Sequence, residues 1–240
     1  MTRVAVFRPA DERIERASQL LESLGVEPVA DPMLAIERTG AVPRSDAEYT
    51  ILTSKTGVEI VADAGWKPGG ELCAIGTATA DALQAAGYRV DRVPAEFSSA
   101  GLVTNLASEV PGMRCEVARS DHGSAVLTDG LAEHGAYVRE TILYELARPP
   151  DAGQSAELAA DGDLGAALFT SSLTVEHFLD AATERGLREA AIAGLGSAVV
   201  GAIGEPTQLT AEAAGIGVDV VPPEASFEAL ARETVERVTS

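Results

Sequence analysis

Residues 135–148, GAYVRETILYELAR, decide the fold, and prolines at 149 and 150 follow them. Apolar and polar side chains alternate along this stretch with the period of two that indicates a strand. It is longer than a typical strand of roughly 5–6 residues, and consecutive prolines end it. A strand of such length can leave one domain and enter another. The expected apolar side comprises Val138, Ile142, Tyr144 and Leu146, and the expected polar side comprises Arg139, Thr141 and Glu145.

A second stretch near the N-terminus, residues 25–38 with the sequence GVEPVADPMLAIER, aligns with the first without a gap. The two copies differ at one informative position, where Leu34 in the first corresponds to Tyr144 in the second. We therefore predict that segments near 33–38 and 142–148 form a two-stranded β-ladder that joins two lobes.

Strand-like and helix-like segments alternate through the rest of the chain, which predicts an α/β fold with parallel sheets. Two pairs of segments also repeat without a gap. The sequence TSKTGVE at 53–59 matches TSSLTVE at 170–176, and residues 75–96 match residues 203–224. Two matches in the same order indicate that one α/β unit was duplicated.

The charge of the chain limits its partners. Its 240 residues carry a formal net charge of −19, and lysine occurs only at positions 55 and 67. Such acidity argues against nucleic acid and anionic membranes as partners. It is explained either by solubility or by adaptation to high salt, where carboxylates hold hydration, and the scarcity of lysine favours the second explanation.

Size and cysteine content bound the domain count and the compartment. The length and a hydrophobic content of 46% allow one large domain or two small ones with their own cores. Cys73 and Cys115 lie far apart in apolar runs with no CxxC motif, which predicts buried thiols in a reducing cytosol. We find neither a signal peptide nor an apolar run of membrane-spanning length, so a cytoplasmic location is expected.

Four loops that follow predicted strands and open predicted helices carry hydroxyl residues. They lie at 53–54, 76–79, 170–171 and 204–207, and in open α/β sheets ligands bind at this edge. Serine and threonine at such places are often helix caps, which is the ordinary explanation for any one of them. Because helix N-termini attract anions and the loops recur in both halves, the four together favour an anion-binding cleft.

Named motifs for other chemistries are missing. GxGxxG and GxxxxGK[ST] are absent, which argues against nucleotide binding. His122, His134 and His177 are scattered without HExxH or cysteine partners, so no metal site is predicted. His134 and His177 fall in predicted helices, whereas His122 follows a strand and is a candidate to touch a substrate. Tyr144 is either an ordinary residue of a half-buried strand or, at the boundary between lobes, a phenol that can donate or accept a proton.

These residues together resemble the uroporphyrinogen-III synthase family. The resemblance rests on Arg8-Pro9, ILTSKTGVE, LFTSSLTVE, the two IGxxT loops, RETILYELARP and VPPEASFEALARET, which cover nearly the whole chain in the family's order. It implies two flavodoxin-like lobes, one made of residues 1–36 and 148–240 and the other of residues 38–146. It also implies a monomeric enzyme that needs no metal and no organic cofactor.

Members of that family cyclise the linear tetrapyrrole hydroxymethylbilane to uroporphyrinogen III, with inversion of the last pyrrole ring and loss of water, on the route to heme, siroheme and cobalamin. By resemblance, Tyr144 is the catalytic residue, although Glu145-Leu146 replaces the polar–Thr pair that usually follows the family tyrosine. The substrate, with its eight carboxylates, would come from hydroxymethylbilane synthase. Asp121, in the loop SDHG at 120–123, departs from a more glycine-rich family loop and is unfavourable beside a polyanion. The expected substrate-binding residues are Arg8, Thr53, Ser54, Lys55, Thr79, Arg119, Thr170, Ser171 and Thr207.

A two-lobed ligand-binding module without catalysis is the alternative, because periplasmic binding proteins and related transcriptional regulators share this arrangement. The chain shows neither a signal peptide nor a DNA-binding segment, so we favour the enzyme. Conversion of hydroxymethylbilane would distinguish the two classes.

Overall fold

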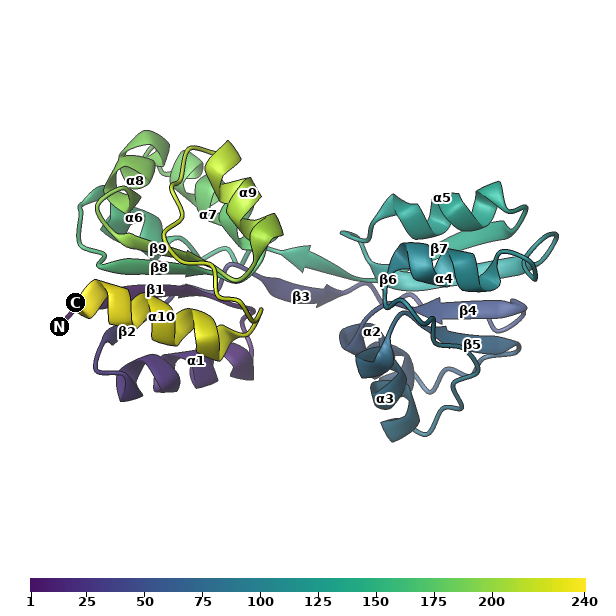
Figure 1. Cartoon of the computed structure of the whole chain (residues 1–240). Coiled ribbons are helices and arrows are strands. Elements are labelled where there is room, and N and C mark those ends of the chain that lie inside the picture. Colours follow the sequence, from purple (N-terminus) through teal and green to yellow (C-terminus); the bar gives the residue numbers. More distant parts are fainter. The chain divides into compact units, whose positions relative to one another are not determined.

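The computed structural model describes all residues, 1–240, and the chain divides into two compact units. The terminal unit comprises residues Met1–Ile36 and Ala147–Ser240, and the middle unit comprises Glu37–Leu146. Each unit is an α/β structure with parallel strands and covering helices (Figure 1), as predicted from the alternation of segments.

The terminal unit is built on a four-stranded sheet in the order β2-β1-β8-β9, with all neighbours parallel. Its strands are β1 (Arg3–Phe7), β2 (Glu27–Ala30), β8 (Ala166–Phe169) and β9 (Val199–Ala202). Its helices are α1 (Glu12–Ser23), α6 (Gln154–Ala160), α7 (Ser172–Glu184), α8 (Arg188–Leu195), α9 (Glu205–Ala213) and α10 (Phe227–Thr239).

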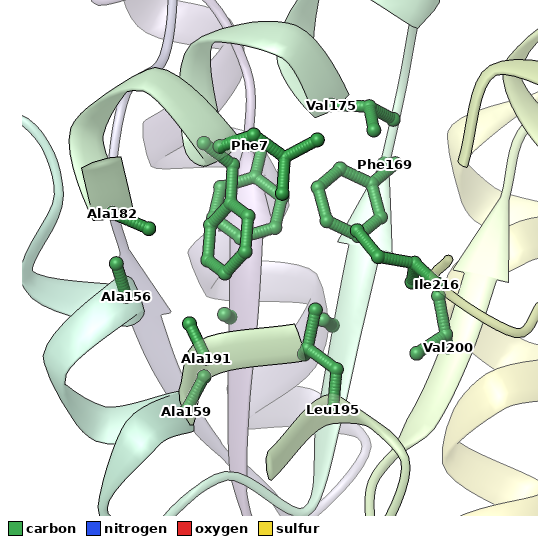
Figure 2. Packing of buried hydrophobic residues seen from close by; sticks show 14 of the residues in the cluster. Phe7, Ala156, Ala159, Phe169, Val175, Ala182, Ala191, Leu195, Val200 and Ile216 are labelled. Atoms are coloured by element: carbon green, nitrogen blue, oxygen red, sulfur yellow. The ribbon is translucent and has the colours of Figure 1, made fainter. Parts of the chain in front are cut away.

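The central strands β1 and β8 are continuous apolar runs because helices cover both faces of the sheet. On one face Phe7 and Phe169 stack with ring centroids 4.6 Å apart, and Phe178 of α7 packs against both. Helices α6 to α9 contribute further residues to this core, as do Val200 of β9 and Ile216 (Figure 2). On the opposite face Val4 and Val6 pack against helices α1 and α10.

The middle unit is built on a five-stranded sheet in the order β3-β7-β6-β4-β5. Its helices α4 and α5 cover one face, where Ile51 and Val117 are buried, and α2 and α3 lie on the other face (Figure 1). The strands are β3 (Ala35–Arg38), β4 (Tyr49–Leu52), β5 (Glu71–Ala74), β6 (Arg114–Ser120) and β7 (Tyr137–Ala147). The helices are α2 (Lys55–Asp63), α3 (Thr77–Ala85), α4 (Ser99–Leu106) and α5 (Ala125–Glu133).

The predicted strand at 135–148 is confirmed as β7, but its two sides differ from the prediction. Along β6, Arg119 pairs with Ile142 and the next residue, Ser120, pairs with Tyr144, so Leu143 is the extra residue of a bulge. Neighbouring residues of a strand point to opposite faces, so Ile142 and Tyr144 do not share one side as predicted. The bulge therefore turns Tyr144 away from the side on which simple alternation placed it.

The predicted long ribbon at 25–38 is wrong, because the structure divides it into β2 and β3. Asp31 interrupts the ribbon: its buried carboxylate accepts hydrogen bonds from the N–H groups of Gly153 and Ser155, each at 2.8 Å, and from the Ser155 hydroxyl. Strand β2 then belongs to the sheet of the terminal unit, whereas β3 lies beside β7 in the sheet of the middle unit. Only the second part of the ribbon corresponds to the predicted ladder segment.

Candidate functional site

The carboxyl ends of the parallel strands β4, β5 and β6 lie along one edge of the middle sheet, since their neighbours run in register. We refer to this as the carboxyl edge, and the loops at 53–54, 75–76 and 121–124 leave from it. Tyr144 also lies here, because it pairs with Ser120 at the end of β6. In open α/β sheets this edge is where ligands bind.

Tyr144 and Ser54 form the centre of the edge in the middle unit. The side chain of Tyr144 is almost wholly buried, and its hydroxyl donates a hydrogen bond of 3.0 Å to Ser54 Oγ. Ser54 is the N-cap of α2, and the same Oγ accepts the N–H of Gly57 at 3.0 Å. A Cβ at Gly57 would lie 3.2 Å from Ser54 Oγ, so glycine leaves room for this arrangement. A phenol thus sits against a helix N-terminus, where negative charge is favoured.

Helix α3 begins at this edge without a side-chain cap. Its N-cap is Gly76, which has no side chain to accept a hydrogen bond, and Thr79 in the first turn is 5% exposed. The first N–H groups of a helix have no partner inside the helix, so they need an acceptor from elsewhere. An uncapped N-terminus at a ligand edge is therefore able to hold an anion.

The terminal unit repeats this feature at the start of α9. Its N-cap is Gly204, again without a side-chain cap, and Thr207 occupies the place of Thr79 with 3% exposure. By contrast, Ser171 caps α7 in a reciprocal pair with Thr174, and Thr170 donates its hydroxyl proton to the carbonyl oxygen of Phe7 at 2.6 Å. Both hydroxyls of the loop at 170–171 are therefore used inside the protein, and Ser171 is the helix cap that the ordinary explanation expects. In the loop at 53–54, Thr53 is half-buried at the end of β4.

Most cations of the chain are already paired with carboxylates. Of the 18 lysine and arginine residues, all but four form salt bridges within 4.0 Å. The four are Arg8, Lys55, Lys67 and Arg188. Arg8 and Lys55, both predicted to bind substrate, lie at carboxyl edges: Arg8 follows β1, and Lys55 is the exposed first residue of α2.

Arg8 is held in an unusual environment for a charged group. Its guanidinium carbon lies 4.8 Å from the centroid of the Phe227 ring, and its Nε is buried without a hydrogen-bond partner. Burial lowers the pKa of Arg8, the nearby Arg13 lowers it further, and Asp11 opposes the shift in part. An arginine stays charged through such changes. A partly desolvated cation without an ion-pair partner is well placed to receive a carboxylate.

Arg119, which the sequence analysis predicts to bind substrate, forms contacts within the protein. Its side chain is 7% exposed, it forms an ion pair with Glu140, and it donates a further hydrogen bond to the carbonyl oxygen of Ser124. A Cβ at Gly123 would lie 2.3 Å from Arg119 Cδ, so the loop after β6 passes directly over this side chain. The charge of Arg119 is thus paired with Glu140, and the side chain supports the loop.

The loop after β6 brings Asp121 and His122 into a close contact that the sequence analysis does not predict. Asp121 Oδ1 accepts the N–H of Leu146 at 3.1 Å and contacts His122 Nδ1 at 2.9 Å. The expected conflict between Asp121 and a polyanionic ligand is reduced, because these two groups already bind the carboxylate. The adjacent residues of the sequence SDHG at 120–123 are the only indication of this pair in the sequence. The contact of Asp121 with β7 cannot be read from the sequence, because it depends on the fold.

Two cavities of the structure do not coincide with this edge. A cavity of about 800 Å³ is lined by Trp66, Lys67 and Tyr88, near the start of β5 at the opposite edge of the middle sheet. Another, of about 420 Å³, lies where β6 and β7 begin. We therefore do not assign either to the candidate site.

The carboxyl edge has neither a cluster of metal-binding side chains nor an exposed thiol. No cluster of three or more histidine, cysteine, aspartate or glutamate side chains is arranged to hold a metal ion. Cys73 and Cys115 are free and buried, and burial raises the pKa of Cys115 to about 11. None of the helices has the length and apolar content to cross a membrane.

Comparisons with known proteins point to one family. A family model described as uroporphyrinogen-III synthase HemD matches residues 15–232. A protein of Methanothermobacter thermautotrophicus, provisionally named a uroporphyrinogen-III synthase, is 32% identical over 230 residues, which cover 89% of this chain and 90% of that protein. The uroporphyrinogen-III synthase of Synechococcus elongatus is 34% identical over 143 residues, covering 56% of this chain and 54% of that protein.

Solved structures show the same fold at lower identity. A mutant uroporphyrinogen III synthase of Thermus thermophilus matches with a TM-score of 0.67 and 21% identity, covering 100% of this chain and 99% of that chain. The uroporphyrinogen-III synthetase of Helicobacter pylori matches with a TM-score of 0.66 and 14% identity, covering 99% of this chain and 100% of that chain.

Proposed function

The chain belongs to the uroporphyrinogen-III synthase family, and we propose that it acts on its substrate with residues at the carboxyl edges of its two units. The reaction is closure of hydroxymethylbilane to uroporphyrinogen III, a step of tetrapyrrole biosynthesis. The observation that carries the proposal is the hydrogen bond between Tyr144 and Ser54, made beside Lys55, which has no carboxylate partner. The family assignment favours the enzyme over a binding module without catalysis.

Tyr144 is the proposed acid of the reaction. Loss of the hydroxyl from the hydroxymethyl carbon leaves an azafulvene cation that the pyrrole ring stabilises, and the departing oxygen needs a proton to leave as water. A positioned phenol supplies such a proton in general acid catalysis. The hydrogen bond to Ser54 holds the Tyr144 hydroxyl at the start of α2, so its position is fixed before substrate binds.

Substrate carboxylates are the proposed ligands of the remaining site residues. Arg8 and Lys55 supply charges that no carboxylate of the protein neutralises, and charge-assisted hydrogen bonds are the strong ones. The uncapped starts of α3 and α9 supply N–H groups, with Thr79 and Thr207 in their first turns. Thr53, Ser54, Thr170 and Ser171 flank these groups at strand ends and contribute mainly through their backbone, because three of the four hydroxyls are engaged internally.

Inversion of the last ring follows from how the chain is held. If the linear tetrapyrrole is bound so that its last ring approaches through its substituted carbon, closure passes through a spiro intermediate and the ring is reversed. This is a matter of positioning more than of strong acid–base chemistry. Neutral donors and two isolated cations therefore suffice, and the reaction as proposed uses no metal or organic cofactor.

We also propose a cellular setting for the enzyme. Two buried free thiols, Cys73 and Cys115, suit a reducing cytoplasm. We further propose that the protein acts as a monomer and receives its substrate from hydroxymethylbilane synthase. Its net charge of −19 supports an adaptation to high salt.

A product assay tests the proposed function directly. The purified protein is incubated with hydroxymethylbilane, the products are oxidised, and the isomers are separated by chromatography. The expected product is isomer III, whereas spontaneous closure gives the uninverted isomer I. Isomer I alone, formed at the rate of a blank without protein, would overturn the proposal.

A further inference from the structure

The loop after β6 presents a histidine that is held by a carboxylate. His122 Nδ1 lies 2.9 Å from Asp121 Oδ1, and the side chains are 45% and 32% exposed. An ionised carboxylate only accepts, so Nδ1 carries the proton in this contact. The chain has three histidines, and the other two, His134 and His177, use Nδ1 to contact backbone carbonyl oxygens. Only His122 is oriented by an acid.

This pair is fastened to the strand that carries Tyr144. The N–H of Asp121 donates to the carbonyl oxygen of Tyr144 at 3.3 Å, and the N–H of Leu146 donates to Asp121 Oδ1 at 3.1 Å. Asp121 therefore binds β7 on both sides of Glu145. Arg119 also holds the loop, because it donates a hydrogen bond to the carbonyl oxygen of Ser124. The position of His122 is set by the same strand that positions the proposed acid.

The charge of Asp121 is used within this arrangement. Burial raises the pKa of Asp121, but the hydrogen bonds from His122 and from the N–H of Leu146 outweigh it and hold the pKa below its usual value. Arg119, the other charged group that contacts the loop, is paired with Glu140. The other nitrogen of the His122 ring, Nε2, is then the atom that can form a hydrogen bond with a ligand. It donates a hydrogen bond only when the ring is protonated, and it accepts one when the ring is neutral.

We propose that His122, oriented by Asp121, is a substrate-binding residue whose protonated Nε2–H binds a carboxylate side chain of the linear tetrapyrrole. The inference rests on the proposed function, because it is that substrate which supplies the carboxylates. A neutral ring presents an acceptor to a carboxylate, which also only accepts, so this contact is lost when the ring loses its proton. Substrate affinity at this edge therefore decreases as pH rises.

Kinetics of isomer III formation across the range in which histidine changes charge, about pH 5 to 8, test the proposal. In the wild-type protein kcat/KM is expected to fall by roughly tenfold across this range, mostly through KM, as a charge-assisted hydrogen bond is lost. In His122→Gln this fall should disappear, with kcat/KM close to the high-pH value of the wild type throughout. His134→Gln is the matched control, because His134 is an exposed histidine of the same unit, and its profile should follow the wild type.

The outcomes separate the inference from the proposed function. Wild-type protein that forms no isomer III would overturn both. Wild-type protein that forms isomer III, together with a His122→Gln profile that still falls with pH like the wild type, would overturn the inference alone. If His122→Gln does not fold by circular dichroism, His122→Asn replaces it in the same comparison.

Discussion

Replacing Tyr144 with phenylalanine removes one hydroxyl and tests the proposed acid. The ring stays buried, and the lost interaction is one hydrogen bond of 3.0 Å to Ser54 Oγ. Ser54 keeps its other hydrogen bond, from the N–H of Gly57, so the cap of α2 remains. The free energy of unfolding should therefore fall by no more than about 1 kcal/mol, the net value of an ordinary hydrogen bond. Leu34, the aligned residue of the other stretch, is an apolar residue in a similarly buried place.

The effect of Tyr144→Phe on catalysis should be larger than its effect on stability. General acid catalysis typically contributes 10²–10⁴-fold, and we expect about 10²-fold or less, because the substrate loses its hydroxyl readily without help. Spontaneous closure competes with the enzyme, so the share of isomer I should rise as isomer III formation slows. The assay measures both isomers by chromatography of the oxidised products, next to a denaturant titration of each variant.

Tyr137→Phe is the control for this experiment. Tyr137 begins the same strand, β7, but this residue is 71% exposed. The substitution also removes one phenolic hydroxyl, but it leaves the hydrogen bond between Tyr144 and Ser54 intact. It should leave both the rate and the isomer ratio unchanged. If Tyr144→Phe also forms only isomer III at the wild-type rate, Tyr144 is a strand residue and the catalytic role has to be abandoned.

Four further outcomes are expected. Thr79→Ala and Thr207→Ala should raise KM more than they lower kcat, since their hydroxyls are proposed to help hold carboxylates beside the free N–H groups of α3 and α9; an unchanged KM in steady-state kinetics would argue against that role. Arg8→Met should raise KM roughly tenfold through loss of a charge-assisted hydrogen bond, while Arg188→Met, which removes an exposed cation elsewhere, should not. The melting temperature should rise between 0.1 M and 1 M salt, where the Debye length shrinks from about 10 Å to 3 Å, because self-repulsion of the net charge of −19 is screened; a flat or falling curve would contradict this. Dialysis against a chelator should leave isomer III formation intact, and loss of activity that added metal restores would show the expectation to be wrong.

The fold class could be predicted because it depends on local patterns. Apolar runs such as 4–7 and 166–169 indicate buried parallel strands, and the alternation at 135–148 indicates the single strand β7. The bulge at Leu143 was not predictable from β7 alone, because a bulge is defined by the register with the partner strand β6. The division of residues 25–38 was missed for a similar reason. Asp31 ends β2 by binding N–H groups more than 120 positions later in the chain.

The candidate site was predicted in its loops but not in the state of its side chains. Repeated loops located the hydroxyl residues at strand ends, which is where the structure has them. Whether a cation is already paired within the protein depends on residues that are distant in sequence. Arg8 has no carboxylate partner, whereas Arg119 forms an ion pair with Glu140. The pairing of His122 with Asp121 is local, but its attachment to β7 through Leu146 is not.

The terminal sheet joins strands from both ends of the sequence, and this affects the order in which the chain folds during synthesis. Strand β1 pairs with β2 through Ala5 and Val29, but its other neighbour, β8, contributes Ala167 and is made only after the whole middle unit. Phe7 likewise stacks on Phe169. The middle unit is contiguous in sequence and can complete its core first, so β1 leaves the ribosome before the middle unit but is covered on its second side only after it. Until β8 emerges, the apolar segment 4–7 can be bound by chaperones or pair with another nascent chain.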